Sequence, residues 1–552
     1  MKNVHYISTF LIFIISFGLQ ATTYYVSKNG DDNNSGTSEN MAWKTINKAA
    51  NTLEAGDEVV ILDGTYEEQV IPKNSGNTGK YIVYRAKNNG KVIIDGENLG
   101  INIGRTALFF IENKEYIKVI GIKAQNFGKE YDLHYDQAGF MMIGSHHIYI
   151  ENCETYNTFS SGIIARAYTD PFTPSHHIYV YGNTIQRACN GGEQECISMT
   201  AGTYEFEIKD NEVFDGSTLP LDQLHGGEGI DAKQGAHDGK IHHNYVHDLP
   251  RKLGIYVDAY SEHTYKIDVY NNTIHDCADG GMALSSEAGG LLEDINVYNN
   301  IAYHNKHYGL NITSWDASIT NNHPMKNIKV INNTFYNNKW NGVSWGGGIV
   351  MENLQSEGVI IDNNICSENI EQIMIVDNVN LSELTLRNNL VFGNQISGLG
   401  FNNNIVEDPE FVDEDSANFH LKSTSAAIDA GNSNHAPTTD FDDNTRPVNG
   451  ISDIGAFEYG STLSTDEYHI SLNKAIVYPN PFKDETIIKI NNNENLVYTL
   501  KLYNSYGQIV KTISNISGSQ IKMNRGSLNN GVYFFQILYG GKSHAEGKLM
   551  IK

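Results

Sequence analysis

The chain has 552 residues, of which 40% are hydrophobic, and its formal net charge is −26. This length allows one large domain and one small domain. The negative charge argues against binding to nucleic acid or to anionic lipid, and it makes any local cluster of Lys and Arg informative, because an acidic substrate would need one.

The first residues predict a secretory signal peptide, residues 1–21. Lys2 precedes an apolar run from about Tyr6 to Leu19, and the small residue Ala21 follows. The run is too short for a comfortable membrane span, and the remaining sequence has no other long apolar stretch. We therefore expect export through the periplasm to the medium or the cell surface, with no membrane span. The five cysteines are few for an exported chain, and we expect buried free thiols.

The next segment predicts the cap of a solenoid. A polar loop leads to a short amphipathic helix, from about Trp43 to Leu53, and then to a strand. Such a cap covers the first coil of a repeat protein, whose core would otherwise be exposed.

A repeat then dominates the chain. Apolar residues, a recurring asparagine and an alternating apolar stretch return at intervals of 28, 33, 28, 28, 33, 31 and 25 residues, by subtraction of successive positions. The aligned asparagines are Asn183, Asn211, Asn244, Asn272, Asn300, Asn333, Asn364 and Asn389. Short β-rich segments with this period predict a right-handed parallel β-helix over residues 22–460.

The asparagine column has a physical reason. An asparagine at a tight turn can adopt a left-handed conformation, and stacked amides can hydrogen-bond to one another along the axis. Cys153 takes the equivalent place in an early coil.

Six segments upstream of these asparagines align as stacked strands: 161–168, 195–202, 228–235, 253–260, 280–287 and 308–315. Alternate side chains of a strand face opposite sides. In 228–235, Ile230 and Ala232 are expected in the core, while Asp231 and Lys233 point outward together.

The outward positions gather charged and aromatic residues on adjacent coils. Stacking places Lys233 beside Asp258 and Asp231 beside Tyr256. The remaining residues that we expect on this face, chiefly for substrate binding, are Arg166, Tyr260, Glu287 and Trp315. Aromatic rings beside carboxylates suit sugars, and a groove along the coils suits a chain-like ligand. The alternative is a solvated face with a cross-strand ion pair contributing about 0.2–1 kcal/mol.

The end of the chain predicts a linker, residues 461–472, and a small β-sandwich, residues 473–552. The Pro479-Asn480-Pro481 motif, "LYNSYGQIV" and the terminal "GKLMIK" resemble the C-terminal sorting domain of the Bacteroidetes type IX secretion system. The resemblance implies the secretion machinery as a partner. The alternative is a carbohydrate-binding β-module.

The large domain resembles secreted pectate-lyase-like β-helix proteins. The resemblance is carried by the cap and by two closing stretches, "DPEFVDEDSANFHLKSTSAAIDAGN" and "DIGAFEY". It is strong for the fold and weak for the reaction, because this fold hosts many functions.

The first chemistry that we expect is β-elimination on an anionic, uronic-acid-containing polysaccharide or oligosaccharide. Arg166 would bind the carboxylate, Lys233 would be the base, and Tyr256 or Tyr260 the acid. Asp258 would keep Lys233 protonated, an obstacle that calcium held by Asp231, Asp258 and Glu228 would remove. Elimination of a hydroxyl at a chain end would make the enzyme a dehydratase.

Two alternatives remain open. Asp231 and Asp258 would hydrolyse a glycoside if their backbones lie roughly 8 Å apart, as strand geometry implies, because inverting pairs are separated by about 6.5–9.5 Å. In that case Lys233 would only orient or tune a carboxylate. The third possibility is a non-catalytic glycan-binding surface protein.

Overall fold

The computed structural model describes residues 21–460 except 101–103, 129–135, 192–193, 221–222, 224–225, 316–321 and 394–402, and residues 476–552 except 479–481, 484, 490–496, 505–508, 519, 527 and 540–541. The expected signal peptide (but for Ala21), the linker and the Pro479-Asn480-Pro481 motif lie outside the described residues. The chain forms two compact units, divided between residues 461 and 462.

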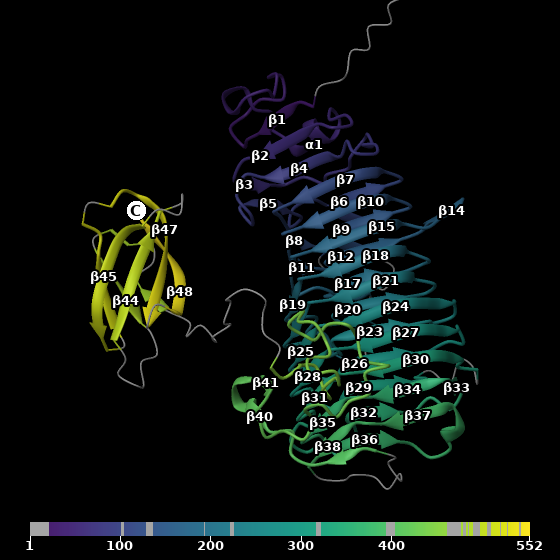
Figure 1. Ribbon diagram of the computed structural model, residues 1–552. Coiled ribbons are helices and arrows are strands. Elements are labelled where there is room, and N and C mark those ends of the chain that lie inside the picture. The colour runs from purple at the N-terminus through teal and green to yellow at the C-terminus, as the bar shows by residue number, and fades with distance from the viewer. Residues whose placement is uncertain are drawn as a thin grey trace, which may run out of the picture. The chain divides into compact units, whose positions relative to one another are not determined.

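The first unit is a stack of parallel β-coils, and most coils give one strand to each of three sheets (Figure 1). The sheet that carries the predicted site has ten strands among the described residues, in this spatial order: β6 (Arg105–Glu112), β9 (Asp136–Ile143), β12 (Ile163–Arg166), β17 (Ile197–Met199), β20 (Ile230–Lys233), β23 (Ile255–Asp258), β26 (Gly280–Ser285), β29 (Tyr308–Thr313), β32 (Gly347–Met351) and β36 (Glu371–Ile375).

The second sheet has fourteen described strands: β1 (Thr23–Val26), β2 (Glu58–Ile61), β4 (Ile82–Ala86), β7 (Glu115–Ile120), β10 (His146–Glu151), β15 (His176–Tyr181), β18 (Tyr204–Lys209), β21 (His237–His242), β24 (Thr264–Tyr270), β27 (Leu292–Tyr298), β30 (Met325–Ile331), β34 (Val359–Asp362) and β37 (Leu384–Arg387), with β33 (Ser356–Glu357) beside β30.

The third sheet has thirteen described strands: β3 (Gly64–Tyr66), β5 (Val92–Asp95), β8 (Ile122–Phe127), β11 (Glu154–Thr158), β16 (Thr184–Gln186), β19 (Glu212–Phe214), β22 (Tyr245–His247), β25 (Thr273–His275), β28 (Ile301–Tyr303), β31 (Thr334–Tyr336), β35 (Ile365–Ser367), β38 (Leu390–Phe392) and β39 (Ile405–Val406). Smaller elements are α1 (Ile46–Ala50), the 3-10 helices η1 (Glu39–Met41), η3 (Leu381–Glu383) and η4 (Glu414–Ser416), and the hairpins β13 (Tyr168–Thr169) with β14 (Phe172–Thr173) and β40 (Phe411–Asp413) with β41 (Asn418–Leu421).

The cap helix is shorter than expected, because α1 covers only Ile46–Ala50. Trp43 forms a parallel bridge with Val26, so its backbone is extended and the helix begins after it. The Thr45 side chain accepts a hydrogen bond from the Lys48 N–H and caps the helix. Trp43 and Leu53 are both buried in the core, as a cap over the first coil requires.

The asparagine column is a continuous hydrogen-bonded ladder, as predicted. The side-chain amide of Asn244 donates to Asn272 Oδ1 at 2.9 Å, and its backbone N–H donates to the same oxygen at 3.0 Å. The same contacts join each column asparagine to the next, and Cys153 N–H donates to Asn183 Oδ1 at 2.8 Å. The side-chain oxygen of each asparagine thus accepts hydrogen bonds from the preceding residue of the column inside the core.

The left-handed residue is not the column asparagine, contrary to expectation. It is the residue just before it, for example Asn271 at φ 51° and Asn363 at φ 60°. The two residues of each Asn-Asn pair therefore have different roles. The first makes the turn, which asparagine tolerates better than most residues, and the second builds the ladder.

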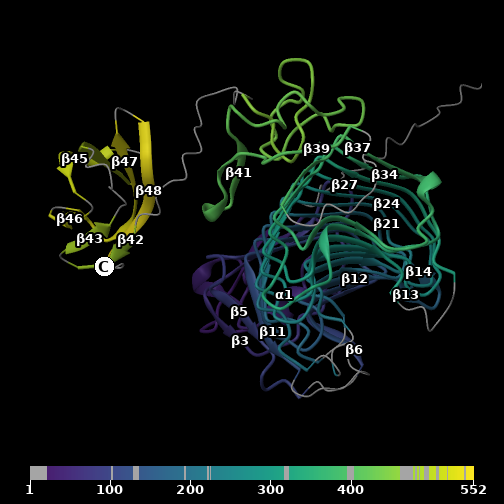
Figure 2. The same ribbon diagram turned by 90° about the horizontal axis from the view of Figure 1, so that it is seen from below.

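The closing segment, residues 407–460, lies along the flank of the coils (Figures 1 and 2). Its Phe419 ring packs on Tyr303 and Tyr336 of the third sheet. Several of the left-handed asparagines bind its backbone: Asn332 Nδ2 donates to the Asp453 carbonyl at 2.8 Å. The segment thus covers apolar surface that the bare coils would expose.

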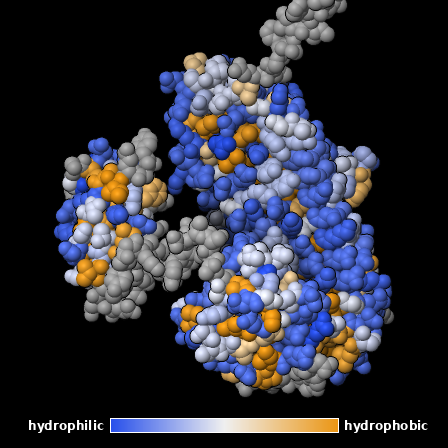
Figure 3. Space-filling view, viewed as in Figure 1, coloured by the Kyte–Doolittle hydropathy of each residue, from blue (hydrophilic) through white to orange (hydrophobic). Residues whose placement is uncertain are grey.

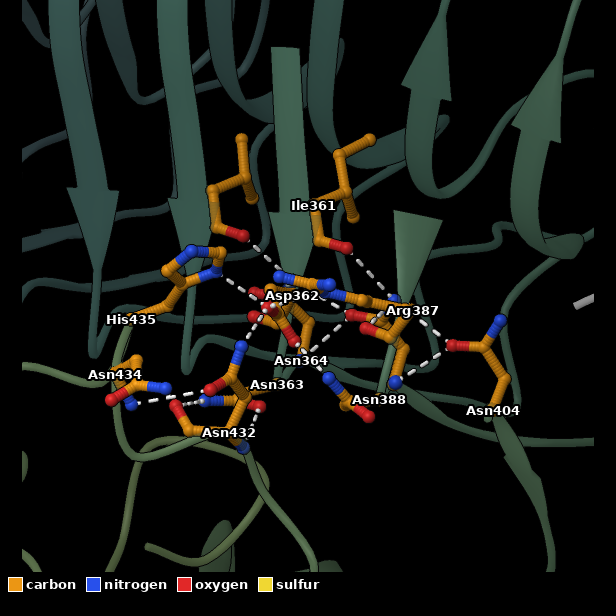
Figure 4. A network of polar contacts seen from close by, with 12 residues as sticks. Ile361, Asp362, Asn363, Asn364, Arg387, Asn388, Asn404, Asn432, Asn434 and His435 are labelled. Carbon is orange, nitrogen blue, oxygen red and sulfur yellow. Dashed lines mark hydrogen bonds and ion pairs between the residues drawn. The ribbon is translucent and has the colours of Figure 1, made fainter. Parts of the chain in front are cut away.

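Asp362 anchors this segment from a fully buried position (Figure 4). Its Oδ2 lies 2.6 Å from His435 Nδ1 and accepts a hydrogen bond from Asn432 Nδ2 at 3.0 Å. Asn388 Nδ2 and Arg387 Nε donate to it from the next coil, at 2.9 and 3.3 Å. Partners on every side satisfy the buried carboxylate, so this network is structural.

The second unit has two antiparallel sheets: β42 (Ile476–Tyr478), β43 (Glu485–Lys489) and β46 (Gln520–Asn524) in one, and β45 (Ile509–Ser517), β44 (Val497–Tyr503), β47 (Gly531–Tyr539) and β48 (Lys542–Ile551) in the other. Buried residues of both sheets form one hydrophobic cluster.

The first unit has a mostly hydrophilic surface on the face seen in Figure 3, and the thiols lie inside. No helix in the described part of the chain is long and apolar enough to cross a membrane. All five cysteines are buried free thiols, as expected.

Candidate active site

The ten-stranded sheet aligns the predicted site residues in the expected register. Asp231 on β20 pairs with Tyr256 on β23, and Lys233 pairs with Asp258. Ile230 and Ala232 are fully buried in the main core, so the alternation of this strand places Asp231 and Lys233 on the outer face.

A cavity of about 490 Å³ opens over this face. Seven of the nine predicted residues line it: Glu228, Lys233, Tyr256, Asp258, Tyr260, Glu287 and Trp315. Five further residues that sequence reasoning missed also line it: Gln194, Glu195, Gln234, Lys252 and Asp279.

The other two predicted residues lie elsewhere. Asp231 has no exposed surface and lies beneath the cavity, 3.7 Å from Lys233 Nζ. Arg166 Nη1 binds Asp136 Oδ2 at 2.9 Å, and Asp136 also binds Arg105 and the Ser160 hydroxyl. Arg166 therefore neutralises an internal carboxylate and is not part of the cavity wall.

Lys233 is surrounded by carboxylates. Its ammonium contacts Glu195 Oε1, and Ser198 Oγ donates to the other oxygen of Glu195 at 2.9 Å. Burial alone would lower the pKa of Lys233, but Glu195 and Asp231 outweigh burial and raise it. Lys233 is therefore a fixed cation and a poor base at neutral pH.

The second lysine of the cavity is paired too. Lys252 Nζ lies 3.2 Å from Glu228 Oε1, and this carboxylate raises the pKa of Lys252. Five carboxylates and two ammonium groups line the cavity in total. Its charge is therefore negative, and both cations are already bound by acids.

Asp258 and Glu287 are neighbouring carboxylates of the cavity wall. Asp258 Oδ1 accepts the backbone N–H groups of Tyr260 at 2.7 Å and of Glu287 at 3.3 Å. Burial and the nearby Glu287 raise the pKa of Asp258 well above its ordinary value. The Tyr256 hydroxyl donates to Glu287 Oε2 at 2.9 Å and supports its negative charge.

The residues expected to hold calcium do not converge on one point. In the described part of the chain, Asp231, Asp258 and Glu228 do not each bring an oxygen to within 4.8 Å of the other two, whereas three histidines elsewhere bring ring nitrogens that close. The Lys233 ammonium lies 3.7 Å from Asp231 Oδ2, and Lys252 Nζ lies 3.2 Å from Glu228 Oε1, so cations already stand beside two of the three acids. This donor set does not fit a calcium ion, so no step of the chemistry below uses one.

The missed residues follow a pattern upstream of the aligned strands. Glu195, like the predicted Glu228, precedes the first inward isoleucine of its coil by two residues. Lys252 and Asp279 precede their inward residues, Ile255 and Met282, by three. Glu195 is the first residue of the aligned segment 195–202, and extending 253–260 and 280–287 by one residue upstream would have revealed Lys252 and Asp279.

Three family models match the chain. Residues 24–181 match the model described as "Pel9A-like, right handed beta helix region", and residues 188–324 match "Right handed beta helix region". Residues 476–552 match "Secretion system C-terminal sorting domain". The Pel9A-like match ends before the coils that form the cavity.

Known proteins of similar sequence or structure share this fold. The uncharacterized protein YwoF of Bacillus subtilis (strain 168) is 26% identical over an alignment of 448 residues that covers 73% of this chain and 91% of YwoF. The complex of XylC with xylose has a TM-score of 0.50 at 14% identity, covering 79% of this chain and 98% of XylC. Pectate lyase Pel9A has a TM-score of 0.48 at 15% identity, covering 80% and 97%.

The family models and the XylC structure confirm the predicted fold, and the sorting domain confirms the predicted localisation. At 14% identity, the XylC structure shows the fold and leaves the reaction open. The sorting domain indicates type IX secretion to the cell surface or the extracellular space. The chain is a right-handed parallel β-helix protein with a Pel9A-like N-terminal region and a C-terminal sorting domain of type IX secretion.

Proposed function

We propose that the cavity hydrolyses glycosidic bonds with Asp258 and Glu287 as the two working carboxylates. The observation that carries the proposal is the state of the charged groups. Asp258 and Glu287 line one cavity from neighbouring coils, while both lysines of that cavity are held in ion pairs. The groups that remain for acid–base chemistry in the cavity are therefore carboxylates.

The two carboxylates have different surroundings, and we assign them different roles for that reason. Burial and Glu287 raise the pKa of Asp258, so Asp258 carries the proton and acts as the general acid toward the glycosidic oxygen. Glu287, stabilised as an anion by the Tyr256 hydroxyl, acts as the base that activates water or as the nucleophile. This replaces the expected pair of Asp231 and Asp258, because Asp231 does not reach the cavity.

Aromatic side chains provide the platform for a sugar ring. The rings of Tyr256 and Trp315 lie 5.2 Å apart and are tilted by 46°. Trp315 is 40% exposed, so one of its faces is open to a ligand. Flat apolar rings next to hydrogen-bonding carboxylates suit the apolar faces and hydroxyl groups of a pyranose or furanose.

The charge of the cavity selects the substrate. Even with Asp258 protonated, four carboxylates face two ammonium groups, so the wall repels a uronate and accepts a neutral or cationic sugar. The substrate that we propose is therefore a neutral or amino-sugar glycan. This differs from the anionic substrate expected from the sequence.

β-Elimination is the second candidate, and the Pel9A-like match of residues 24–181 favours it. It requires Lys233 or Lys252 to lose a proton in the presence of Glu195, Glu228 and Asp231. These carboxylates raise the pKa of both lysines, which disfavours the reaction at neutral pH.

The test is a panel of neutral, amino-sugar and uronate oligosaccharides, incubated with and without a chelator. Hydrolysis yields new reducing ends without ultraviolet absorbance, whereas elimination yields an absorbing double bond. Release of an absorbing product from a uronate would overturn the proposal. Binding to a glycan without cleavage of any panel member would also overturn it, in favour of a non-catalytic binding protein.

Two variants separate the roles of the carboxylates. Asp258→Asn should lower cleavage of natural glycosides about 100-fold or more, and spare substrates whose leaving group needs no proton. Glu287→Gln should lower both activities. Asp268→Asn is the matched control, because Asp268 lies on β24 of another sheet and should keep full activity. Equal activity of all three variants would refute the assignment.

A further inference from the structure

Two neighbouring strands of the fourteen-stranded sheet, β10 and β15, each begin with a pair of histidines. The sequence Ser-His-His-Ile-Tyr occurs at residues 145–149 and again at 175–179. In the structure His146 pairs with His176, and Ile148 pairs with Ile178. Four imidazoles are thereby brought together on a sheet that does not contribute to the catalytic cavity.

A local break in the strand places both rings of each pair on the same side. Neighbours on a regular strand point to opposite faces. His147 and His177 have left-handed φ angles of 54° and 51°, which interrupt the alternation. As a result, the Nδ1 atoms of His146 and His147 lie 3.0 Å apart, and those of His176 and His177 lie 2.8 Å apart.

The rings also stack between coils. The centroids of His147 and His177 lie 4.3 Å apart, with 12° between the ring planes. His147, His176 and His177 each offer a ring nitrogen, and these three atoms lie within 4.8 Å of one another. All three residues are partly exposed, so an ion can reach them from solvent.

We propose that His147, His176 and His177 form a binding site for a divalent transition metal of the zinc class. Two imidazole nitrogens held at about 2.0–2.1 Å by a tetrahedral ion lie about 3.3 Å apart. The observed 2.8 Å between His176 and His177 therefore needs only a small opening of the rings. The nearly parallel rings of His147 and His177 must turn toward each other about χ2.

A carboxylate stands beside the three rings. Glu205 Oε2 lies 3.0 Å from His177 Nδ1, close enough to supply the fourth ligand. On the other side, Glu115 Oε2 lies 2.9 Å from His146 Nε2. Three imidazoles with one carboxylate or water form a donor set that zinc accepts and that calcium does not.

The metal would clamp two coils together. His147 belongs to β10, and His176 and His177 belong to β15, so one ion bridges neighbouring strands whose other links are backbone hydrogen bonds and side-chain stacking. Any ligand that binds only the folded chain stabilises it. The expected effect is a higher melting temperature with no requirement for metal in glycan cleavage.

The experiment titrates the full chain, freed of metal by a chelator and dialysed, with zinc chloride in a calorimeter. One ion should bind per chain, and cobalt(II) at the same site should give the visible absorption of a tetrahedral complex. His176→Ala should weaken zinc binding at least tenfold and abolish the zinc-dependent rise in melting temperature.

His237→Ala is the matched control. His237 belongs to the same stacked column, between Tyr204 and Tyr265, but lies outside the three ligands. It should bind zinc as the unmodified chain does. If His176→Ala fails to fold by circular dichroism, His147→Gln provides the same test with a smaller change. Absence of saturable binding, or equal binding by the ligand variants and the control, would overturn the proposal.

Discussion

Replacing Lys233 with methionine tests whether this lysine is a charge partner or a catalytic base. The change leaves Glu195 and Asp231 buried, with exposed side-chain fractions of 3% and 0%, and without their cation. Charges about 4 Å apart attract by about 4 kcal/mol at an effective dielectric constant of about 20, and breaking a buried pair typically costs about 3–5 kcal/mol. Lys233→Met should therefore lower the free energy of unfolding in urea by about 3–5 kcal/mol.

The pH dependence of this loss has a definite sign. Because the pKa of Lys233 is raised, its contribution is complete below the ordinary lysine pKa of about 10.4 and is lost only as the pH rises through the higher folded value. The titration of the lysine should thus leave the loss in Lys233→Met unchanged below about pH 10. The loss should shrink in acid, where Asp231, whose pKa is raised by burial and by Glu195, becomes protonated.

An exposed ion pair provides the control. Lys326 on β30 lies 3.4 Å from Glu357, and both side chains are largely exposed. Lys326→Met should cost less than about 1 kcal/mol. A double variant, Lys233→Met with Glu195→Gln, should recover part of the stability. If Lys233→Met were as stable as the unmodified chain but inactive, the charge-partner reasoning would be refuted and a base would be favoured.

Three further predictions concern the site and the ladder. Tyr256→Phe removes the hydrogen bond to Glu287 and should lower kcat about tenfold with little change in folding, as measured by steady-state kinetics and circular dichroism. The kcat/KM of the unmodified enzyme should fall as pH rises through the raised pKa of Asp258, since the acid must be protonated; this limb should vanish in Asp258→Asn. Asn272→Ala breaks the ladder and removes the shared acceptor of the Asn244 side-chain amide and backbone N–H in the core, so urea unfolding should show a loss of at least about 2 kcal/mol.

The fold could be predicted because its signal is repeated in the sequence. Every coil repeats the apolar alternation and the asparagine, so errors in one coil are corrected by the others, and the register of Lys233 against Asp258 followed from that alignment. The turn chemistry was predicted wrongly by one residue. In an Asn-Asn pair both residues favour turns, and the sequence does not show which of them takes the left-handed φ.

The site was predicted in part because strands align and loops do not. Tyr256, Asp258 and Glu287 follow from the aligned positions of successive coils, whereas Glu195 reaches Lys233 from a loop ahead of its strand. Arg166 was misplaced for a different reason. Arg166 lies in the predicted outward column, but Asp136 on the preceding coil binds it. That carboxylate was not part of the alignment.

The most direct test of hydrolysis is to cleave a panel substrate in heavy-oxygen water and to weigh the products. Hydrolysis predicts that one product carries a heavy oxygen and that the product masses sum to substrate plus water, with the reaction lost in Asp258→Asn. Products that sum to the mass of the substrate alone, with a new double bond and no heavy oxygen, would contradict the account.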